Sequence, residues 1–108
     1  KDLIIRGGVN IAPLEIDNAI AKHPDVFEVA TIGIPDKIYG EELVAYVAPR
    51  PESGLTEAAL RAHCESVLPA FKRPRDIVLV DTLAHNQRGK IDRRAMAERW
   101  KADHAEPV

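Results

Sequence analysis

Short runs of apolar and β-branched residues, separated by turn-forming dipeptides, predict the strands of this chain. Residues 2–11, "DLIIRGGVNI", contain two such runs around Gly7 and Gly8, and a Gly-Gly pair suits the positive-φ positions of a tight hairpin turn. Residues 26–34, "VFEVATIGI", and residues 43–49, "LVAYVAP", predict two further strands. These two strands run antiparallel if the loop between them, "PDKIYGEE", is as short as it looks.

Apolar residues that recur every three or four positions predict three helices. Each helix has a residue suited to its N-cap or its first turn: Pro13, Thr56 and Asp92. The first helix is expected to stop at the His-Pro pair of residues 23–24. The second carries an apolar stripe at helical spacing: Leu60, Cys64, Val67 and Leu68. The third places Met96 and Trp100 one turn apart.

One more strand and the end of the chain complete the predicted architecture. Residues 76–80, "DIVLV", form a continuous apolar run typical of a buried strand, and the helix before it predicts a parallel neighbour. A loop follows over residues 81–90, and "KADHAEPV" is expected to be a frayed tail. We therefore predict an α+β fold, with an N-terminal β-hairpin and a small sheet of about three strands packed with three helices. We expect the domain to cover residues 1–102 and a flexible tail to cover residues 103–108.

Charge is nearly balanced over the chain but unevenly placed. The 15 basic and 17 acidic residues nearly cancel, yet residues 72–101 hold 9 basic and 4 acidic side chains. This excess predicts either an anionic ligand or a solvated basic face. Nucleic-acid binding is not expected, because two Tyr, two Phe and one Trp provide no interleaving of basic and aromatic residues.

The single cysteine and the lack of long apolar runs limit the class of protein. Cys64 has no partner for an internal disulfide, and its place on an apolar helix face predicts a core residue. The chain has no apolar run of about 18 residues and no cleavable signal, so we expect no membrane span and a cytoplasmic location. It begins at Lys1 without a methionine and leads directly into "LIIRGG", which predicts a piece of a longer polypeptide.

The stretch "NQRGKIDRR" contains a Gly-Lys pair, which raises the question of phosphate binding. A P-loop requires G-x-x-x-x-G-K-[ST], but Ala84 occupies the first glycine position before Gly89, and Ile91 replaces the hydroxyl after Lys90. Lys90 is therefore either a single mobile cation of a site whose other parts lie elsewhere, or an ordinary surface lysine. The Gly-Gly pair of the hairpin is likewise compatible with a turn alone or with the close approach of a ligand.

Other polar residues are explained by structure at least as well as by chemistry. Glu41 and Glu42 precede a predicted strand, so we expect a solvated loop edge rather than an acid/base pair. The histidines lack metal-ligand spacing, and no metal site is predicted from them: His23, His63, His85 and His104. His85 alone shares the loop of Lys90.

Two separated motifs resemble one known superfamily. "KDLIIRGGVNIAPLEIDNAI" resembles the motif that opens the C-terminal domain of adenylate-forming enzymes, which include acyl-CoA synthetases, peptide-synthetase adenylation domains and luciferases. "FKRPRDIVLVDTLAHNQRGKIDRR" resembles the closing signature of the same domain. The resemblance covers about residues 1–100 and is more specific than a lone Gly-Lys pair.

The resemblance implies a two-step ligase. Such enzymes join a carboxylic acid to ATP, which gives an acyl-adenylate and pyrophosphate, and then transfer the acyl group to the thiol of coenzyme A. The small C-terminal domain swings between the two steps against the large N-terminal domain of the same chain. ATP and Mg²⁺ would be bound mainly by that N-terminal domain, coenzyme A would be a co-substrate, and the isolated C-terminal domain would be inactive.

The resemblance also implies roles for residues near both ends of the chain. Lys90 falls on the lysine that reaches the substrate carboxylate and the α-phosphate during adenylation, and Asn86 and Gly89 belong to its supporting loop. Lys1 and Asp2 fall at the hinge, where the chain leaves the large domain.

The glycine pair falls on the loop that replaces the lysine at the active site in the second step. Gly7 and Gly8, with Val9 after them, would line the passage for the pantetheine arm of coenzyme A. Val9 stands where Glu is common in the family, and Ala84 and His85 stand where Pro-Arg is common, which bears on the subfamily.

The resulting hypothesis is the C-terminal domain of an AMP-forming acyl-CoA synthetase of the fatty-acid or aryl-CoA ligase type. One alternative is an adenylation domain that loads a carrier protein, which uses the same motifs. Another is a non-catalytic binding or assembly module that keeps the fold. The residues do not predict which acid is activated.

Overall fold

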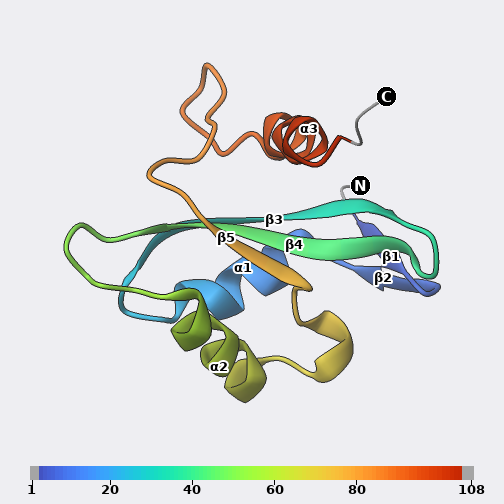
Figure 1. Ribbon diagram of the computed structural model, residues 1–108, viewed down its shortest axis with the longest axis horizontal. Helices are drawn as coiled ribbons and strands as arrows, with labels where there is room; N and C mark the ends of the chain where they lie inside the picture. The colour runs from blue at the N-terminus through green and yellow to red at the C-terminus, as the bar shows by residue number, and fades with distance from the viewer. Residues whose placement is uncertain (1–2, 106–108) are drawn as a thin grey trace.

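A computed structural model of the chain describes residues 3–105, so the predicted hinge residues Lys1 and Asp2 lie outside the described residues. The elements in chain order are β1 (Ile4–Arg6), β2 (Val9–Ile11), α1 (Pro13–Ala21), β3 (Val26–Asp36), β4 (Gly40–Pro49), α2 (Glu57–Val67), the 3-10 turn η1 (Ala70–Lys72), β5 (Asp76–Leu79) and α3 (Arg93–Asp103). The predicted α+β class is confirmed (Figure 1).

Strand β4 is the centre of a single five-stranded sheet. It pairs antiparallel with β3 along its whole length, from Asp36↔Gly40 to Val26↔Pro49. On its other edge it pairs with β1 at one end and with β5 further along, and β5 runs parallel to β4 as predicted. Because β1 also pairs with β2, the N-terminal hairpin is part of the same sheet and not a separate unit before it.

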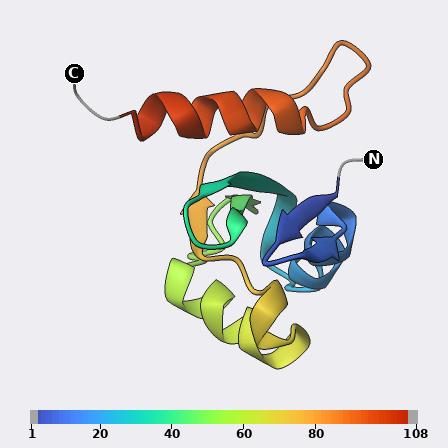
Figure 2. The same cartoon turned by 90° about the vertical axis from the view of Figure 1, so that its right-hand side faces the viewer.

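Helices cover both faces of the sheet. Figures 1 and 2 show α1 and α2 on one face and α3 on the other. The first face buries the apolar stripes of two helices: Ile16, Ile20, Leu60 and Cys64. The second face buries Met96 and Trp100 of α3 against β3 and β4. Residues 43–48 of β4 are all buried, which explains their uninterrupted apolar run in a strand covered on both sides.

The predicted helix starts are confirmed. Pro13 occupies the first turn of α1. The Oγ1 of Thr56 accepts a hydrogen bond from the N–H of Ala59 at 3.1 Å, and Asp92 Oδ1 accepts one from the N–H of Ala95 at 3.0 Å. Each cap satisfies an N–H that has no partner within its helix, and replacing such a cap by alanine typically costs about 1 kcal/mol.

Three predicted details are wrong. Val67 is 37% exposed, because α2 ends there, whereas Leu60, Cys64 and Leu68 of the predicted stripe are buried. Strands β3 and β4 extend into the predicted loop and leave only residues 37–39 between them. Helix α3 continues through Asp103 into the segment expected to fray, and His104 stacks on Trp100 beyond it. Within residues 3–105, no helix is long and apolar enough to cross a membrane.

Candidate active-site elements

Lys90 lies in a closed loop that leads into α3. His85 and Ile91 form an antiparallel bridge at the base of this loop, and the N–H of Asn86 donates to the carbonyl of Lys90 at 2.7 Å. Below the bridge, the N–H of Asp92 donates to the carbonyl of Ala84 at 2.9 Å. These bonds give the loop a defined backbone, so the position from which the exposed side chain of Lys90 extends is fixed.

The side chain of Asn86 organises the tip of the Lys90 loop. Its Oδ1 accepts hydrogen bonds from the N–H groups of Arg88, at 2.8 Å, and Lys90, at 3.1 Å. Gly89 has a φ of 82°, a left-handed conformation that other residues rarely adopt. The structure therefore brings Asn86, Gly89 and Lys90 together in one loop.

An ion pair with a buried carboxylate attaches the start of α3 to the rest of the domain. Arg93 Nη2 donates to Asp17 Oδ2 at 2.5 Å, and Arg93 Nη1 donates to the carbonyl of Thr31 at 3.1 Å. Asp17, which is 6% exposed, also accepts a hydrogen bond from the N–H of Thr31 at 2.7 Å. The pair joins α1, β3 and α3, and it links the opening motif of the chain to the closing one.

Gly7 and Gly8 form the predicted hairpin turn. Their φ angles are 59° and 83°, so both central residues are left-handed, as in the type I′ turns of two-residue hairpins. The N–H of Gly7 donates to the carbonyl of Tyr39 at 2.8 Å, and a Cβ on Gly7 would lie 3.3 Å from the ring of Tyr39. A Cβ on Gly8 would meet nothing within 4 Å, and Val9 beside it is 42% exposed. The outer side of this turn is open.

The expectation that Glu41 and Glu42 form a solvated loop edge is wrong, because both lie in β4. Glu42 is 5% exposed, and its Oε1 accepts a hydrogen bond from Arg6 Nε at 2.7 Å. This hydrogen bond raises the pKa of the Arg6 guanidinium, which also lies 4.0 Å from the centre of the Tyr39 ring. Glu41 Oε1 accepts a bond from the N–H of Ile5 at 2.8 Å. Both carboxylates therefore hold β1 and the glycine turn against β4.

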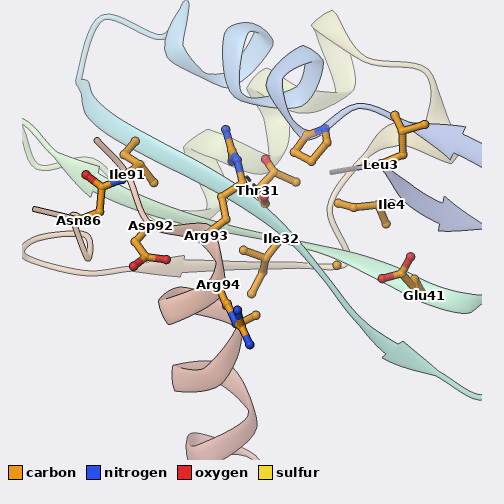
Figure 3. Close-up of a pocket in the computed structure, with 13 residues that line it drawn as sticks. Leu3, Ile4, Thr31, Ile32, Glu41, Asn86, Ile91, Asp92, Arg93 and Arg94 are labelled. Carbon is orange, nitrogen blue, oxygen red and sulfur yellow. Dashed lines mark hydrogen bonds between the residues drawn. The ribbon is translucent and has the colours of Figure 1, made fainter. Parts of the chain in front are cut away.

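A groove of about 610 Å³ separates the hairpin from the start of α3 (Figure 3). Leu3, Ile4 and Glu41 line the hairpin side, and Asn86 and Arg94 lie on the side of the loop and α3. Neither Lys90 nor the glycine turn lines it, so the groove does not bring the two predicted site elements together.

The two predicted site elements lie on different parts of the domain. In Figures 1 and 2 the loop before α3 extends beside that helix, whereas the hairpin turn lies between β1 and β2, at another end of the sheet. Among residues 3–105, no three His, Cys, Asp or Glu side chains are grouped so that they would hold a metal ion. The domain therefore presents the lysine and the glycine turn on separate parts of its surface.

Several supporting residues were not predicted from the sequence. Asp17 lies between Ile16 and Ile20 on the buried face of α1, and a charged residue at such a position requires a partner, which is a signal that sequence analysis can use. The partner of Asp17 is Arg93, which lies in a distant segment of the chain. The same holds for Glu28, which is the partner of His85. Sequence patterning gives no register for such pairs.

Comparison with known proteins identifies the family. Residues 15–90 match the model of the AMP-binding enzyme C-terminal domain. Over 93 residues the chain is 47% identical to a sulfoacetate–CoA ligase of Cupriavidus necator, covering 86% of this chain and 18% of the ligase. Over 100 residues it is 41% identical to an oxalate–CoA ligase of Arabidopsis thaliana, covering 93% of this chain and 20% of that protein.

The fold has the same relatives. The crystal structure of apo MatB from Rhodopseudomonas palustris superimposes with a TM-score of 0.89 at 35% identity, over 96% of this chain and 21% of that one. The chain thus spans about a fifth of the length of the relatives it matches. It belongs to the AMP-binding enzyme C-terminal domain family of the adenylate-forming acid–CoA ligases.

Proposed function

We propose that this chain is the mobile C-terminal domain of an AMP-forming acid–CoA ligase. In this proposal Lys90 serves formation of the acyl-adenylate, and the Gly7-Gly8 turn serves formation of the coenzyme A thioester. The observation that carries the proposal is the arrangement of these two elements. Both are exposed, both have defined backbones, and they lie on different parts of one domain, so that a rotation would exchange one for the other at a neighbouring active site.

Lys90 has the properties that adenylation requires. A carboxylate and a polyphosphate repel each other, and a cation between them relieves this repulsion. An ammonium about 4 Å from an anion contributes on the order of 4 kcal/mol at an effective dielectric near 20. The loop fixes the backbone of Lys90 through Asn86, while the long exposed side chain can enter a site on another domain and leave it again.

The glycine turn has the properties that a passage for the pantetheine arm requires. The space beyond Gly8 is open, and the absence of a side chain lets another molecule approach the backbone closely. The turn is supported by Arg6, which binds Glu42 and lies over the ring of Tyr39, and by the carbonyl of Tyr39, which accepts the N–H of Gly7. A turn supported in this way can keep its shape when the domain moves.

ATP, Mg²⁺ and the acid would be bound mainly by the N-terminal part of the protein. The relatives are named for different acids, sulfoacetate and oxalate among them, so we propose the class of reaction and not the acid. The roles of Lys1 and Asp2 as the hinge remain predictions, as does the cytoplasmic location.

The proposal is tested with the full-length protein that contains this domain. We expect pyrophosphate exchange into ATP that depends on one carboxylic acid, and formation of that acid's coenzyme A thioester when coenzyme A is added. Lys90→Ala should lower the exchange by about 10²-fold or more. Lys101→Ala, which removes a lysine on the exposed surface of α3, is the matched control and should leave exchange unchanged.

The outcomes separate the alternatives that the motifs leave open. Acid-dependent exchange with transfer to a carrier protein but not to coenzyme A would point to an adenylation domain that loads a carrier. An absence of exchange with every acid, with Lys90→Ala indistinguishable from wild type, would point to a non-catalytic module with the same fold.

A further inference from the structure

His85 makes a side-chain contact between the Lys90 loop and the sheet. Its Nε2 lies 2.7 Å from Oε2 of Glu28 on β3, and the two side chains are 33% and 24% exposed. Glu28, Ala30 and Ile32 occupy every second position of β3 and therefore lie on the same face of the sheet. Ala30 and Ile32 pack under α3, so Glu28 also projects from the face over which the loop runs. The contact therefore spans 57 residues of sequence and attaches the base of the loop to β3, an edge strand of the sheet.

The chemistry of the pair defines what each partner does. A carboxylate only accepts hydrogen bonds, so Nε2 of His85 carries a hydrogen and donates the hydrogen bond to Glu28. Both the neutral imidazole with this tautomer and the imidazolium supply that N–H, so the contact requires a donor at this position and not a particular charge. An arginine at position 85 also offers N–H donors, whereas an alanine offers none.

The other hydrogen bonds of the loop lie within it or join it to α3, and within residues 3–105 none of them joins it to the sheet. The hydrogen bonds of Asn86 lie within the loop and fix its shape. The bond between Asp92 and Ala84 joins the loop to the start of α3, and the N–H of Ala84 lies 3.3 Å from Sδ of Met96 on the same helix. The pair of His85 and Glu28 instead joins the loop to β3, and a second direction of attachment prevents the loop from pivoting about its junction with α3.

We infer that His85 is a positioning residue for acyl-adenylate formation, which it serves by holding the Lys90 loop against Glu28. This inference rests on the proposed function. Lys90 follows His85 by five positions and is joined to its neighbour Asn86 through two hydrogen bonds, so a shift of residue 85 is transmitted to the lysine backbone. A displacement of about 1 Å at a reacting group can cost about 10²-fold in rate. The glycine turn lies elsewhere, so the thioester step should not depend on this contact.

The test measures both half-reactions separately in the full-length enzyme. His85→Ala should lower the turnover number for adenylation by about 10- to 100-fold with little change in the KM for ATP. Thioester formation from supplied acyl-adenylate should stay within about 2-fold of wild type, and His85→Arg should restore most of the adenylation rate. Glu28→Ala should match His85→Ala, and the double variant should be no slower than either single variant, because both substitutions break one contact.

Two further measurements complete the design. Hydrogen exchange by mass spectrometry on the same full-length variants should show faster exchange in a peptide that covers residues 84–92 for His85→Ala and Glu28→Ala. Glu57→Gln is the control, since it weakens an exposed ion pair with Arg61 on α2, and it should change neither exchange nor rate.

Each outcome supports or overturns the inference. Loss of adenylation alone, with rescue by arginine, would support it. An adenylation rate that His85→Ala leaves unchanged while Lys90→Ala abolishes it would overturn the inference and leave the proposed function standing. Equal losses in both half-reactions would show a structural role and would also overturn it. A wild-type enzyme without acid-dependent exchange would overturn the proposed function, and the inference with it.

Discussion

Removal of Arg93 should destabilise the domain through the carboxylate that it leaves behind. Arg93→Ala breaks the ion pair with Asp17 and the hydrogen bond to the carbonyl of Thr31, while Asp17 stays in a site where it is 6% exposed. Breaking a buried ion pair from one side typically costs about 3–5 kcal/mol. The side chain of Arg93 is 28% exposed, so water can reach part of the vacated space, and we expect the lower end, about 3 kcal/mol.

Urea denaturation of the 108-residue chain measures this loss. A chain of this size has an m-value of about 1.5 kcal/mol per molar urea, so the midpoint should fall by about 2 M. Asp17→Asn keeps an oxygen for the N–H of Thr31 but loses the charge and the acceptor for Arg93, so it should cost about 2 kcal/mol. The double variant should lose less than the sum of the two, because both substitutions remove the same interaction.

Arg94→Ala is the matched control for Arg93→Ala. Arg94 is the next residue of α3 and is exposed, so its removal should change the free energy of unfolding by at most about 0.5 kcal/mol. A midpoint for Arg93→Ala equal to that of Arg94→Ala would refute the reasoning, because the pair would then contribute nothing to the attachment of α3.

Two further predictions concern titratable groups. Burial raises the pKa of the Cys64 thiol. Iodoacetamide at mildly alkaline pH should therefore alkylate Cys64 at least about 10-fold faster in denaturant than in the native chain. Equal rates would contradict the burial of Cys64 in the core. Hydrogen bonds from the N–H groups of Tyr39 and Ile38 lower the pKa of Asp36 below the ordinary value of 3.8. The stability that this carboxylate contributes is therefore present above about pH 4 and is lost as pH falls through the lower folded pKa, so Asp36→Asn should flatten the fall in stability below pH 4. An unchanged slope would show that the carboxylate has no such role.

The local elements of this domain could be predicted because their signals lie within a few residues. Gly7 and Gly8 specify a turn that requires two left-handed residues, and the caps Thr56 and Asp92 are followed directly by helical periodicity. The parallel pairing of β5 followed from the helix that precedes it. The family resemblance rested on two separate motifs, and the family match confirms it.

The contacts between distant segments could not be predicted in this way. Glu42 reads as an exposed residue next to a turn, yet Arg6, 36 positions earlier, lets it be buried in β4. The strand pairing of β1 with β4 has one pair of register partners, Arg6 and Gly40, which no periodic pattern specifies. The link between His85 and Glu28 is of the same kind. Such pairs depend on the register of strands that are far apart in the chain.

The central claim is that Lys90 and the glycine turn serve different steps, and a crossed measurement of both half-reactions in the full-length enzyme tests it most directly. Gly8→Asn suits this test, because asparagine tolerates the φ of 83° better than most residues and its side chain would project into open space. Gly54→Asn, at a φ of 72° with similar open space on a distant loop, controls for backbone strain. We expect Lys90→Ala to lose about 10²-fold or more in adenylation with thioester formation nearly intact, and Gly8→Asn to show the reverse pattern. Equal losses in both steps for either variant would contradict the assignment of the two elements to separate steps.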